Sequence, residues 1–293
     1  MRVRVIAADS MGVRSLATVV EVSGVVIGLD LGASIAPRRY GLPPHETEWK
    51  ALERALDEAR RWIRESHIIT VTHYHYDHYM RDEPDLYRGK ILAVKDPKRN
   101  INRSQAIRSY VFLKKLGVEE LADVRIADGQ LLEFEGVRIE FSPPVWHGEP
   151  GTRVGRLVMV RILSEEGTVV FTSDVQGPAD PEALRILEEW SRPRPDIVVV
   201  GGPPTYFAGF KVPVRAVEAG LAGLKRLITL LRPRVVVVDH HLLRDINYSE
   251  KIAEHYEAAR DAGVRLVTAA EFMGRPVNQL EARRRELWRG SSG

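Results

Sequence analysis

The sequence predicts an α/β fold of the α+β kind, in which β-sheets are covered by helices on their outer sides. Short runs rich in β-branched residues alternate with helical patterns along the chain, and Ile197–Val200 and Val235–Val238 are wholly apolar. Wholly apolar strands joined by helices are typical of parallel strands buried on both faces. Because helices are interspersed in both halves of the chain, we expect them to cover the sheets.

The first half of the chain shows mainly strand patterns. The pair Ser23-Gly24 separates two β-rich runs and predicts a hairpin turn. Apolar residues recur at a helical period from Glu46 to Ile63. The strands expected here are Val3–Ala7, Leu16–Val22, Val25–Leu29, His67–Val71, Val124–Ile126, Leu131–Phe134 and Val137–Phe141, and the helices are Glu46–Ile63 and Ser104–Leu116.

The second half changes to a regular alternation of strand and helix. A turn at Glu166-Gly167 separates two strands, and the proline that begins Pro181–Trp190 favours the start of a helix. The expected strands are Leu157–Leu163, Val169–Thr172, Ile197–Val200, Val235–Val238 and Val264–Val267, and the helices are Pro181–Trp190, Val214–Leu231 and Ser249–Ala262.

Composition excludes several classes of site and partner. The chain has no cysteine, which rules out disulfides, cysteine-ligated zinc and iron–sulfur clusters. With 43 Lys and Arg against 40 Asp and Glu, the net charge is only +3, so charge alone does not indicate a nucleic-acid partner. No apolar run approaches the roughly 20 residues of a membrane span. The N-terminus also lacks a signal-peptide pattern, so we expect a cytoplasmic protein without membrane contact.

The pattern of elements indicates one domain. No internal repeat and no linker rich in Gly, Ser or Pro interrupts it. We therefore expect a single domain over residues 1–289 and a flexible tail over 290–293. The sequence leaves the oligomeric state open.

A cluster of histidines follows the strand expected at His67–Val71. Three imidazoles and one carboxylate lie within six positions, at His73, His75, Asp77 and His78. His73 and His75 are two residues apart, so in an extended segment both point to the same side and can reach one ion. Asp77 and His78 can serve a second ion beside the first. The alternative is a polar turn without function, although burying so many histidines without a metal is costly.

Further chemically active side chains follow other expected strands. His147 comes after the strand that ends at Phe141, and Asp174 comes after Val169–Thr172. His240 and His241 follow Val235–Val238. Catalytic groups are typically placed at strand ends, so we expect these groups to meet at one edge. Alternatively, His147 is a surface histidine and Asp174 is a turn or cap residue.

These motifs occur in the same order as in the metallo-β-lactamase superfamily, and the chain resembles a prokaryotic branch of that superfamily. The resemblance implies a four-layer αββα sandwich with a dinuclear metal site at one edge. It implies that His73, His75 and His147 bind the first ion and that Asp77, His78 and His240 bind the second. Asp174 resembles the carboxylate that bridges the two ions.

Neighbouring residues leave some roles open. Of the adjacent His240 and His241 we prefer His240 as the last ligand, because it lies closer to the strand end. Arg244 then falls four residues on, which resembles the spacing in the nuclease branch of the superfamily. His241 would lie beside the ligands or face the substrate. Asp30 is expected to orient a ligand or tie a loop, and Tyr206 to contact substrate or to be a structural turn residue.

Imidazole and carboxylate ligands without thiolate suit two Zn²⁺ ions, with Mn²⁺ or Fe²⁺ as possible occupants. The predicted reaction is metal-dependent hydrolysis of an ester-type or phosphodiester bond, in which a hydroxide shared by the ions attacks and Asp77 orients it. The motif of the superfamily's diiron oxygen-reducing branch resembles His-x-Glu-x-Asp, with Glu at the position of His75. The histidine here therefore favours hydrolysis over redox chemistry. Alternatives are a phosphodiesterase or nuclease acting on RNA or DNA, and a non-enzymatic metal-containing binding module.

Two basic segments add weaker expectations. The run from Lys95 to Arg103 is interpreted as a solvated loop and helix face, with a phosphate or nucleic-acid contact as the alternative. Arg283-Arg284-Arg285 is interpreted as a solvated helix face. A small-molecule substrate is therefore expected, with nucleic acid as the alternative.

Overall fold

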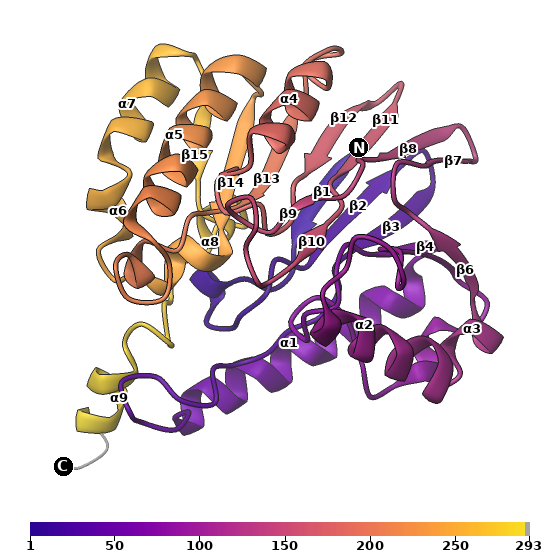
Figure 1. Cartoon of the computed structure of the whole chain (residues 1–293), viewed down its shortest axis with the longest axis horizontal. Coiled ribbons are helices and arrows are strands. Elements are labelled where there is room, and N and C mark those ends of the chain that lie inside the picture. Colours follow the sequence, from indigo (N-terminus) through magenta and orange to yellow (C-terminus); the bar gives the residue numbers. More distant parts are fainter. Residues whose placement is uncertain (291–293) are drawn as a thin grey trace.

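Two β-sheets lie face to face in the computed structural model, which describes residues 1–290 (Figure 1). The first sheet has its strands in sequence order, with an antiparallel β1-β2-β3 meander continued by parallel pairing from β3 to β6. Its strands are β1 (Arg2–Val5), β2 (Thr18–Val22), β3 (Val25–Leu29), β4 (Ile68–Val71), β5 (Ile91–Val94) and β6 (Asp123–Ile126).

The second sheet has seven strands in the order β15-β14-β13-β12-β11-β8-β7. Pairing is parallel from β15 to β12 and antiparallel from β12 to β7. Its strands are β7 (Leu131–Phe134), β8 (Val137–Phe141), β11 (Val160–Ser164), β12 (Gly167–Phe171), β13 (Ile197–Gly201), β14 (Val235–Asp239) and β15 (Arg265–Val267), and β9 (Val145–Trp146) pairs separately with β10 (Arg156–Leu157).

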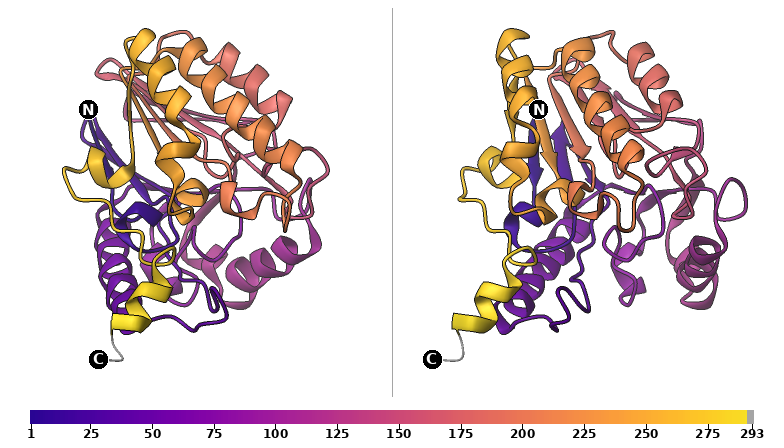
Figure 2. Two further views of the ribbon diagram at one scale, coloured as in Figure 1. Left: turned by 90° about the vertical axis from the view of Figure 1, so that its left-hand side faces the viewer. Right: turned by 60° about the vertical axis from the view of Figure 1, so that its left-hand side comes forward.

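Helices cover the outer face of each sheet, as the two turned views in Figure 2 show. The first sheet is covered by α1 and the α2 region, and the second by α4, α5 and α7. The helices are α1 (Glu46–Glu65), α2 (Arg103–Tyr110), α3 (Val118–Leu121), α4 (Pro181–Glu189), α5 (Val214–Leu231), α6 (Tyr248–Lys251), α7 (Ala253–Asp261), α8 (Ala269–Phe272) and α9 (Arg284–Gly290), with a π-helix at Val111–Lys115 and 3₁₀ helices η1 (Asp9–Met11), η2 (Pro84–Tyr87), η4 (Thr205–Phe207) and η5 (His240–Arg244).

The hydrophobic core is divided into three clusters, which define the layers. One cluster lies between the sheets and includes Ile27 from the first sheet and Phe171 from the second. A second cluster joins the first sheet to α1, and a third joins the second sheet to α4, α5 and α7. Helix, sheet, sheet and helix therefore follow one another, and the predicted four-layer αββα sandwich is confirmed.

The structure interrupts two segments that the sequence pattern predicts as continuous. The strand expected at Leu157–Leu163 is divided, because the Val158 amide bonds the Thr72 carbonyl and Met159 bonds Ser142 instead of continuing the β9 pairing. The helix expected at Ser249–Ala262 is divided at the buried Ile252, which has a φ of −116° and a ψ of 21°. Tertiary contacts override the local pattern in both places.

The C-terminal segment also corrects the sequence interpretation. Gly290 belongs to α9 rather than to a flexible tail, and residues 291–293 lie outside the described part of the chain. Arg284 is fully buried, so the interpretation of the basic triplet as a solvated face is wrong for this residue, whereas Arg283 and Arg285 are exposed. Its guanidinium donates to both carboxylate oxygens of Glu48 in α1, at 2.8 and 2.7 Å. None of the helices in residues 1–290 is long and apolar enough to cross a lipid bilayer.

Arg284→Ala should lower the free energy of unfolding by about 3–5 kcal/mol, because the substitution leaves the Glu48 carboxylate buried without its partner. Urea unfolding followed by circular dichroism measures the change. Arg283→Ala is the control, because the exposed Arg283 pairs only with Glu286 and should contribute less than about 1 kcal/mol. Equal losses in the two variants would show that the buried pair does not fasten α9.

Candidate metal centre

The carboxyl ends of strands from both sheets meet at one edge of the sandwich. Asp30 follows β3, and its carboxylate accepts hydrogen bonds from the backbone and hydroxyl of Thr72, which follows β4. The hydroxyl of Ser173, which follows β12, donates to the same carboxylate at 3.0 Å. A buried hydrogen-bond network therefore ties the loops after three strands together.

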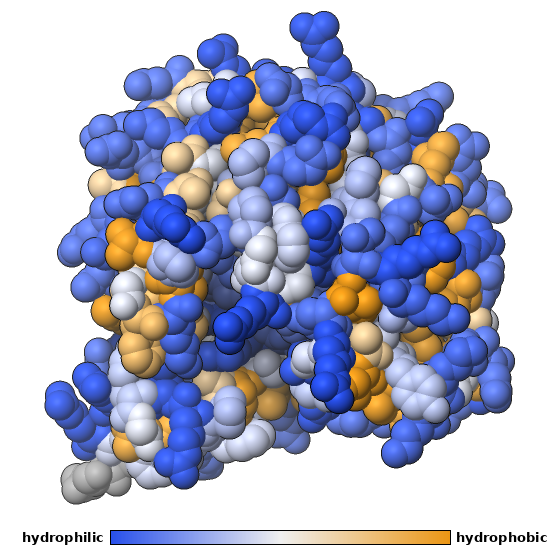
Figure 3. Space-filling model, viewed as in Figure 1, coloured by the Kyte–Doolittle hydropathy of each residue, from blue (hydrophilic) through white to orange (hydrophobic). Residues whose placement is uncertain are grey.

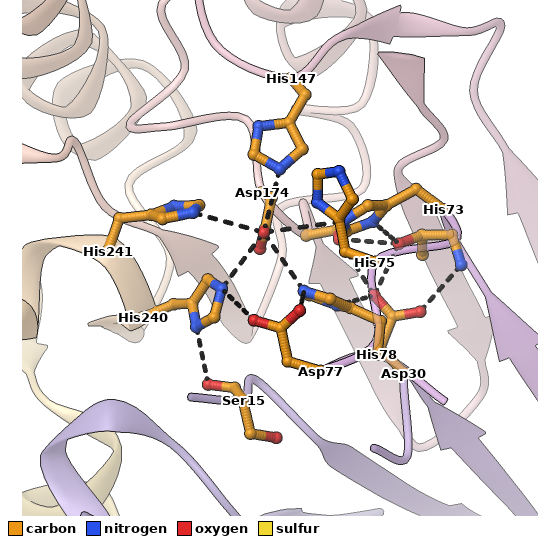
Figure 4. Close-up of polar contacts among 12 residues, drawn as sticks. Ser15, Asp30, His73, His75, Asp77, His78, His147, Asp174, His240 and His241 are labelled. Carbon is orange, nitrogen blue, oxygen red and sulfur yellow. Dashed lines mark hydrogen bonds and ion pairs between the residues drawn. The ribbon is translucent and has the colours of Figure 1, made fainter. Parts of the chain in front are cut away.

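The side chains singled out in the sequence come together at this edge. Figure 4 shows the carboxylate of Asp174 at the centre of the cluster, with contacts to His73, His78, His147, His240 and His241. The Oδ2 atom of Asp174 lies 3.2 Å from the Nε2 atom of each of three histidines. Potential ligand atoms lie within 4.8 Å of one another in four overlapping groups: His73, His75, His147 and Asp174; Asp30, His73 and His78; Asp77, His78 and His240; and Asp174, His240 and His241.

The donor set fits divalent cations. Three buried atoms of the cluster have no hydrogen-bond partner in the described chain: His78 Nε2, His147 Nε2 and Asp174 Oδ1. Two ring nitrogens, His73 Nε2 and His75 Nδ1, also face each other at 3.1 Å. Buried polar atoms are rarely left unsatisfied, and imidazole and carboxylate together are typical ligands of zinc, manganese or iron.

Outer hydrogen bonds fix the orientation of the rings. The Nδ1 atom of His78 lies 2.9 Å from Asp30, and that of His240 lies 2.8 Å from Asp9. Asp30 accepts the Nδ1 proton of His78 and leaves its Nε2 free for an ion, an arrangement typical of metal-binding histidines. His240 Nδ1 also lies 3.1 Å from the Ser15 carbonyl, and Arg244 lies 3.0 Å from its Nε2. The Gln176 side chain contacts His147 Nδ1 at 3.3 Å.

Sequence reasoning missed Asp9 and Gln176. Asp9 stands alone after the first strand, and no local spacing links it to a histidine more than 200 residues away. Gln176 follows Asp174 by two residues, and this closeness to a predicted ligand was the one available signal.

Backbone strain is concentrated at the same edge. Asp30, Ser173 and His240 have φ angles of 50°, 52° and 58°, in the left-handed region that residues other than glycine rarely adopt. Such conformations cost on the order of 1–3 kcal/mol each and persist where surrounding contacts impose them. The buried network around these residues imposes them here.

Burial and neighbouring charges shift the protonation of the cluster. Burial, assisted by the neighbouring histidines, holds the pKa of His73 well below its ordinary value and lowers that of His75 to about 3. Their imidazoles are therefore neutral, which is the form that binds metals. Burial also lowers the pKa of His240, but the carboxylates of Asp174 and Asp9 together raise it to about 9.

The two adjacent histidines occupy different surroundings. Both belong to a group of potential ligands with Asp174, but His240 alone also shares a group with Asp77 and His78. His241 lies 3.5 Å from Asp174 and has an unpartnered Nδ1. His241 also lines the neighbouring cavity. These surroundings favour His240 as the ligand of the second ion, and the assignment remains a prediction.

The remaining predicted side chains lie around the cluster. Arg244 donates to Asp9 at 2.9 Å and lies 3.0 Å from His240 Nε2, so its charge is already paired. Tyr206 lines the cavity, and the Arg39 guanidinium covers its ring at 4.4 Å. Lys95 is buried against Asp128 at 2.7 Å and therefore does not belong to a solvated surface.

A cavity of roughly 1270 Å³ opens beside the cluster. Figure 3 shows this face hollowed near its centre, with hydrophilic side chains at the margin. The cavity is lined by His75, Asp77, His147, Asp174 and His241, together with residues of α1, α2 and η4. The predicted ligands are therefore accessible to a substrate from this side.

Solved structures share this architecture. The chain resembles an isothiocyanate hydrolase from Delia radicum gut bacteria (TM-score 0.53, 14% identity, 88% of this chain and 94% of that one). It also resembles the metallo-β-lactamase fold protein YhfI from Bacillus subtilis (TM-score 0.52, 13% identity, 91% and 94% covered). A third likeness is to CmlA, a diiron β-hydroxylase from Streptomyces venezuelae (TM-score 0.54, 15% identity, 90% and 51% covered). The chain thus has the metallo-β-lactamase fold, as its motif order predicts.

Sequence comparison gives the particular family. The chain is 53% identical to a UPF0282 protein of Aeropyrum pernix over the full length of both. It is 40% identical to a UPF0282 protein of Korarchaeum cryptofilum over 98% of this chain and 94% of that one. It therefore belongs to the UPF0282 family, although no family model matches it.

Asp30→Asn should weaken zinc binding by about 10- to 100-fold, because the amide no longer accepts the His78 Nδ1 proton as strongly. Competition with a chromophoric chelator measures the affinity. The control is Asp85→Asn, which removes an exposed carboxylate paired with Arg88. Unchanged zinc affinity in a folded Asp30→Asn protein would contradict this orienting role.

Proposed function

We propose that the protein is a metal-dependent hydrolase acting on an ester-type or phosphodiester substrate. The observation that carries the proposal is that Asp174 belongs to two groups of potential ligands, one with His147 and one with His240, beside a cavity large enough for a small molecule. We assign His73, His75 and His147 to one ion, Asp77, His78 and His240 to the other, and Asp174 to both. Two zinc ions suit this donor set best, and Mn²⁺ or Fe²⁺ are compatible with it.

When bound, the ions would lower the pKa of water and polarise the scissile group. The chain's own residues supply position and charge around them. Asp77 lines the cavity, and its Oδ2 lies 3.5 Å from His240 Nε2, so it can hold the attacking water beside the substrate. His241 lines the same cavity and is assigned to contact the substrate or its leaving group.

Position 75 supports hydrolysis over oxidation. The CmlA hydroxylase has a similar fold and is a diiron enzyme, so the fold alone leaves both chemistries open. His75 supplies a nitrogen to the group that contains His73 and His147. The motif of the oxygen-reducing branch resembles one with Glu at this position. An additional neutral imidazole favours zinc, which has no redox chemistry.

A second candidate is a phosphodiesterase, including a nuclease acting on RNA or DNA. The spacing from His240 to Arg244 favours it, and Arg244 lines the cavity. Against it, the Arg244 guanidinium is buried against Asp9, and Lys95 in the basic run is buried against Asp128. We therefore rank a small-molecule substrate ahead of nucleic acid.

Asp174→Ala and His75→Ala should each reduce bound metal from about two ions per chain to about one or fewer, and should lower turnover at least 100-fold. Elemental analysis measures the metal content. A panel of p-nitrophenyl acetate, a thioester, a lactone and bis(p-nitrophenyl) phosphate measures turnover. His67→Ala is the control, because His67 is an exposed histidine outside the cluster.

The panel also separates the candidate functions. Cleavage confined to the phosphodiester, with salt-sensitive binding of RNA or DNA, would favour the phosphodiesterase. Absence of turnover on every substrate at full metal occupancy would favour a non-enzymatic metal-containing binding module. Full metal content and full turnover in both variants would contradict the assigned site.

A further inference from the structure

Cations in the cavity wall divide into two groups by their partners. Four arginines of the wall form ion pairs with carboxylates, within 2.6 to 2.9 Å: Arg14 with Glu281, Arg60 with Glu83, Arg81 with Asp82, and Arg244 with Asp9. Three further cations of the wall, Arg108, Arg153 and Lys211, form no ion pair with any residue of the described chain.

Arg108 contacts Tyr76, which lies between His75 and Asp77 in the sequence and so connects Arg108 to the candidate metal centre. The guanidinium carbon of Arg108 lies 4.4 Å from the centre of the Tyr76 ring, and that of Arg81 lies 4.2 Å from it. Tyr76 is 41% exposed and lines the cavity. One aromatic ring of the ligand motif therefore holds two cations at the cavity wall.

The loop that carries Arg153 is fastened to the helix that carries Arg108. Asn102 and Gln105 of the α2 region donate side-chain hydrogen bonds to the carbonyls of Arg153 and Val154, both at 2.8 Å. Gly155 has a φ of 101°, and a Cβ there would lie 2.8 Å from the Gln105 amide, so close approach requires glycine. The two unpaired arginines are thereby kept on the same side of the cavity.

The wall formed by α1 has a different character. Trp49, Leu52 and Leu56 recur along one face of α1 and line the cavity, and Ile35 and Met80 continue the apolar surface. A ligand in the cavity therefore meets cations on the α2 side and apolar side chains on the α1 side.

We infer that the cavity binds a small anionic molecule, whose phosphate or carboxylate group is recognised by Arg108 and Arg153 and whose apolar part packs on α1. The recognition of the anion is independent of catalysis. The inference rests on the proposed function only if the bound molecule is also a substrate, whose scissile bond would then lie at the metal centre. A guanidinium without a carboxylate partner can donate two parallel hydrogen bonds to either anion. A concave site with unpaired cations also concentrates anions from solution.

The test uses the full chain loaded with zinc and phenylphosphonate as probe, which carries an anionic group and an apolar ring and is not hydrolysed. Titration calorimetry measures its affinity for the wild type and for Arg108→Gln, Arg153→Gln and Arg103→Gln. Arg103 is the matched control, because it removes the same charge from the exposed face of α2, away from the cavity. Elemental analysis establishes equal zinc content, so a difference in affinity reports the arginines alone.

We expect Arg108→Gln to weaken binding about 10-fold or more, Arg153→Gln to weaken it several-fold, and Arg103→Gln to change it less than twofold. Arg153 is exposed in a loop, so its substitution stays informative even where Arg108→Gln fails to fold. Unchanged affinity in Arg153→Gln and in folded Arg108→Gln would overturn the inference. So would tighter binding of single-stranded RNA that Arg103→Gln weakens as much as Arg108→Gln, since this would indicate a polymer on the surface.

The outcome is separable from that of the proposed function. Loss of phenylphosphonate affinity in Arg108→Gln supports the anion site even where no ester or phosphodiester is hydrolysed by the wild type. Conversely, turnover by the wild type together with unchanged affinity in the variants rejects the anion site and leaves the hydrolase proposal standing.

Discussion

The site depends on one buried carboxylate surrounded by imidazoles. Asp174 Oδ2 lies within 3.7 Å of ring nitrogens from five histidines, and all these side chains except that of His241 are almost completely buried. The histidines cannot all be protonated, because burial and mutual repulsion lower the pKa of His73, His75 and His241. Bound cations would neutralise the charge of the carboxylates while the imidazole rings stay neutral. The hydrogen bond from His78 Nδ1 to Asp30 fits this arrangement, because it directs the free Nε2 into the cluster.

The same interaction explains how two sheets from distant parts of the sequence end at one edge. Asp30 receives hydrogen bonds from Thr72 and Ser173 and orients His78, so one carboxylate joins both sheets to the ligand cluster. These buried contacts offset the cost of the left-handed backbone at Asp30, Ser173 and His240. Strain and polar burial therefore occur together where ligand direction matters most.

The sequence predicted what has a local pattern. Apolar runs such as those in β13 and β14 indicated the strands. The spacing within the histidine motif indicated the candidate ligands, because all of them follow directly after one strand. Partners at long range left no such signal. Arg284 and Glu48 are 236 residues apart, and so the basic triplet suggested a solvated face instead of a buried pair. The interruptions at Val158 and Ile252 likewise depend on contacts that periodicity does not encode.

The distribution of paired and unpaired cations separates structural arginines from those available to a ligand. Arg244 and Arg284 are buried and each has a carboxylate partner, because an unpaired charge in the interior is costly. Arg108 and Arg153 lie at a solvated cavity wall, where water lowers that cost while the site stays empty. Solvent screening at the wall weakens each contact between a cation and a bound anion, but anions are still attracted into the cavity. These cations therefore favour the capture and orientation of an anionic ligand over very tight binding. A hydrolase benefits from this balance, because its product must leave the same cavity.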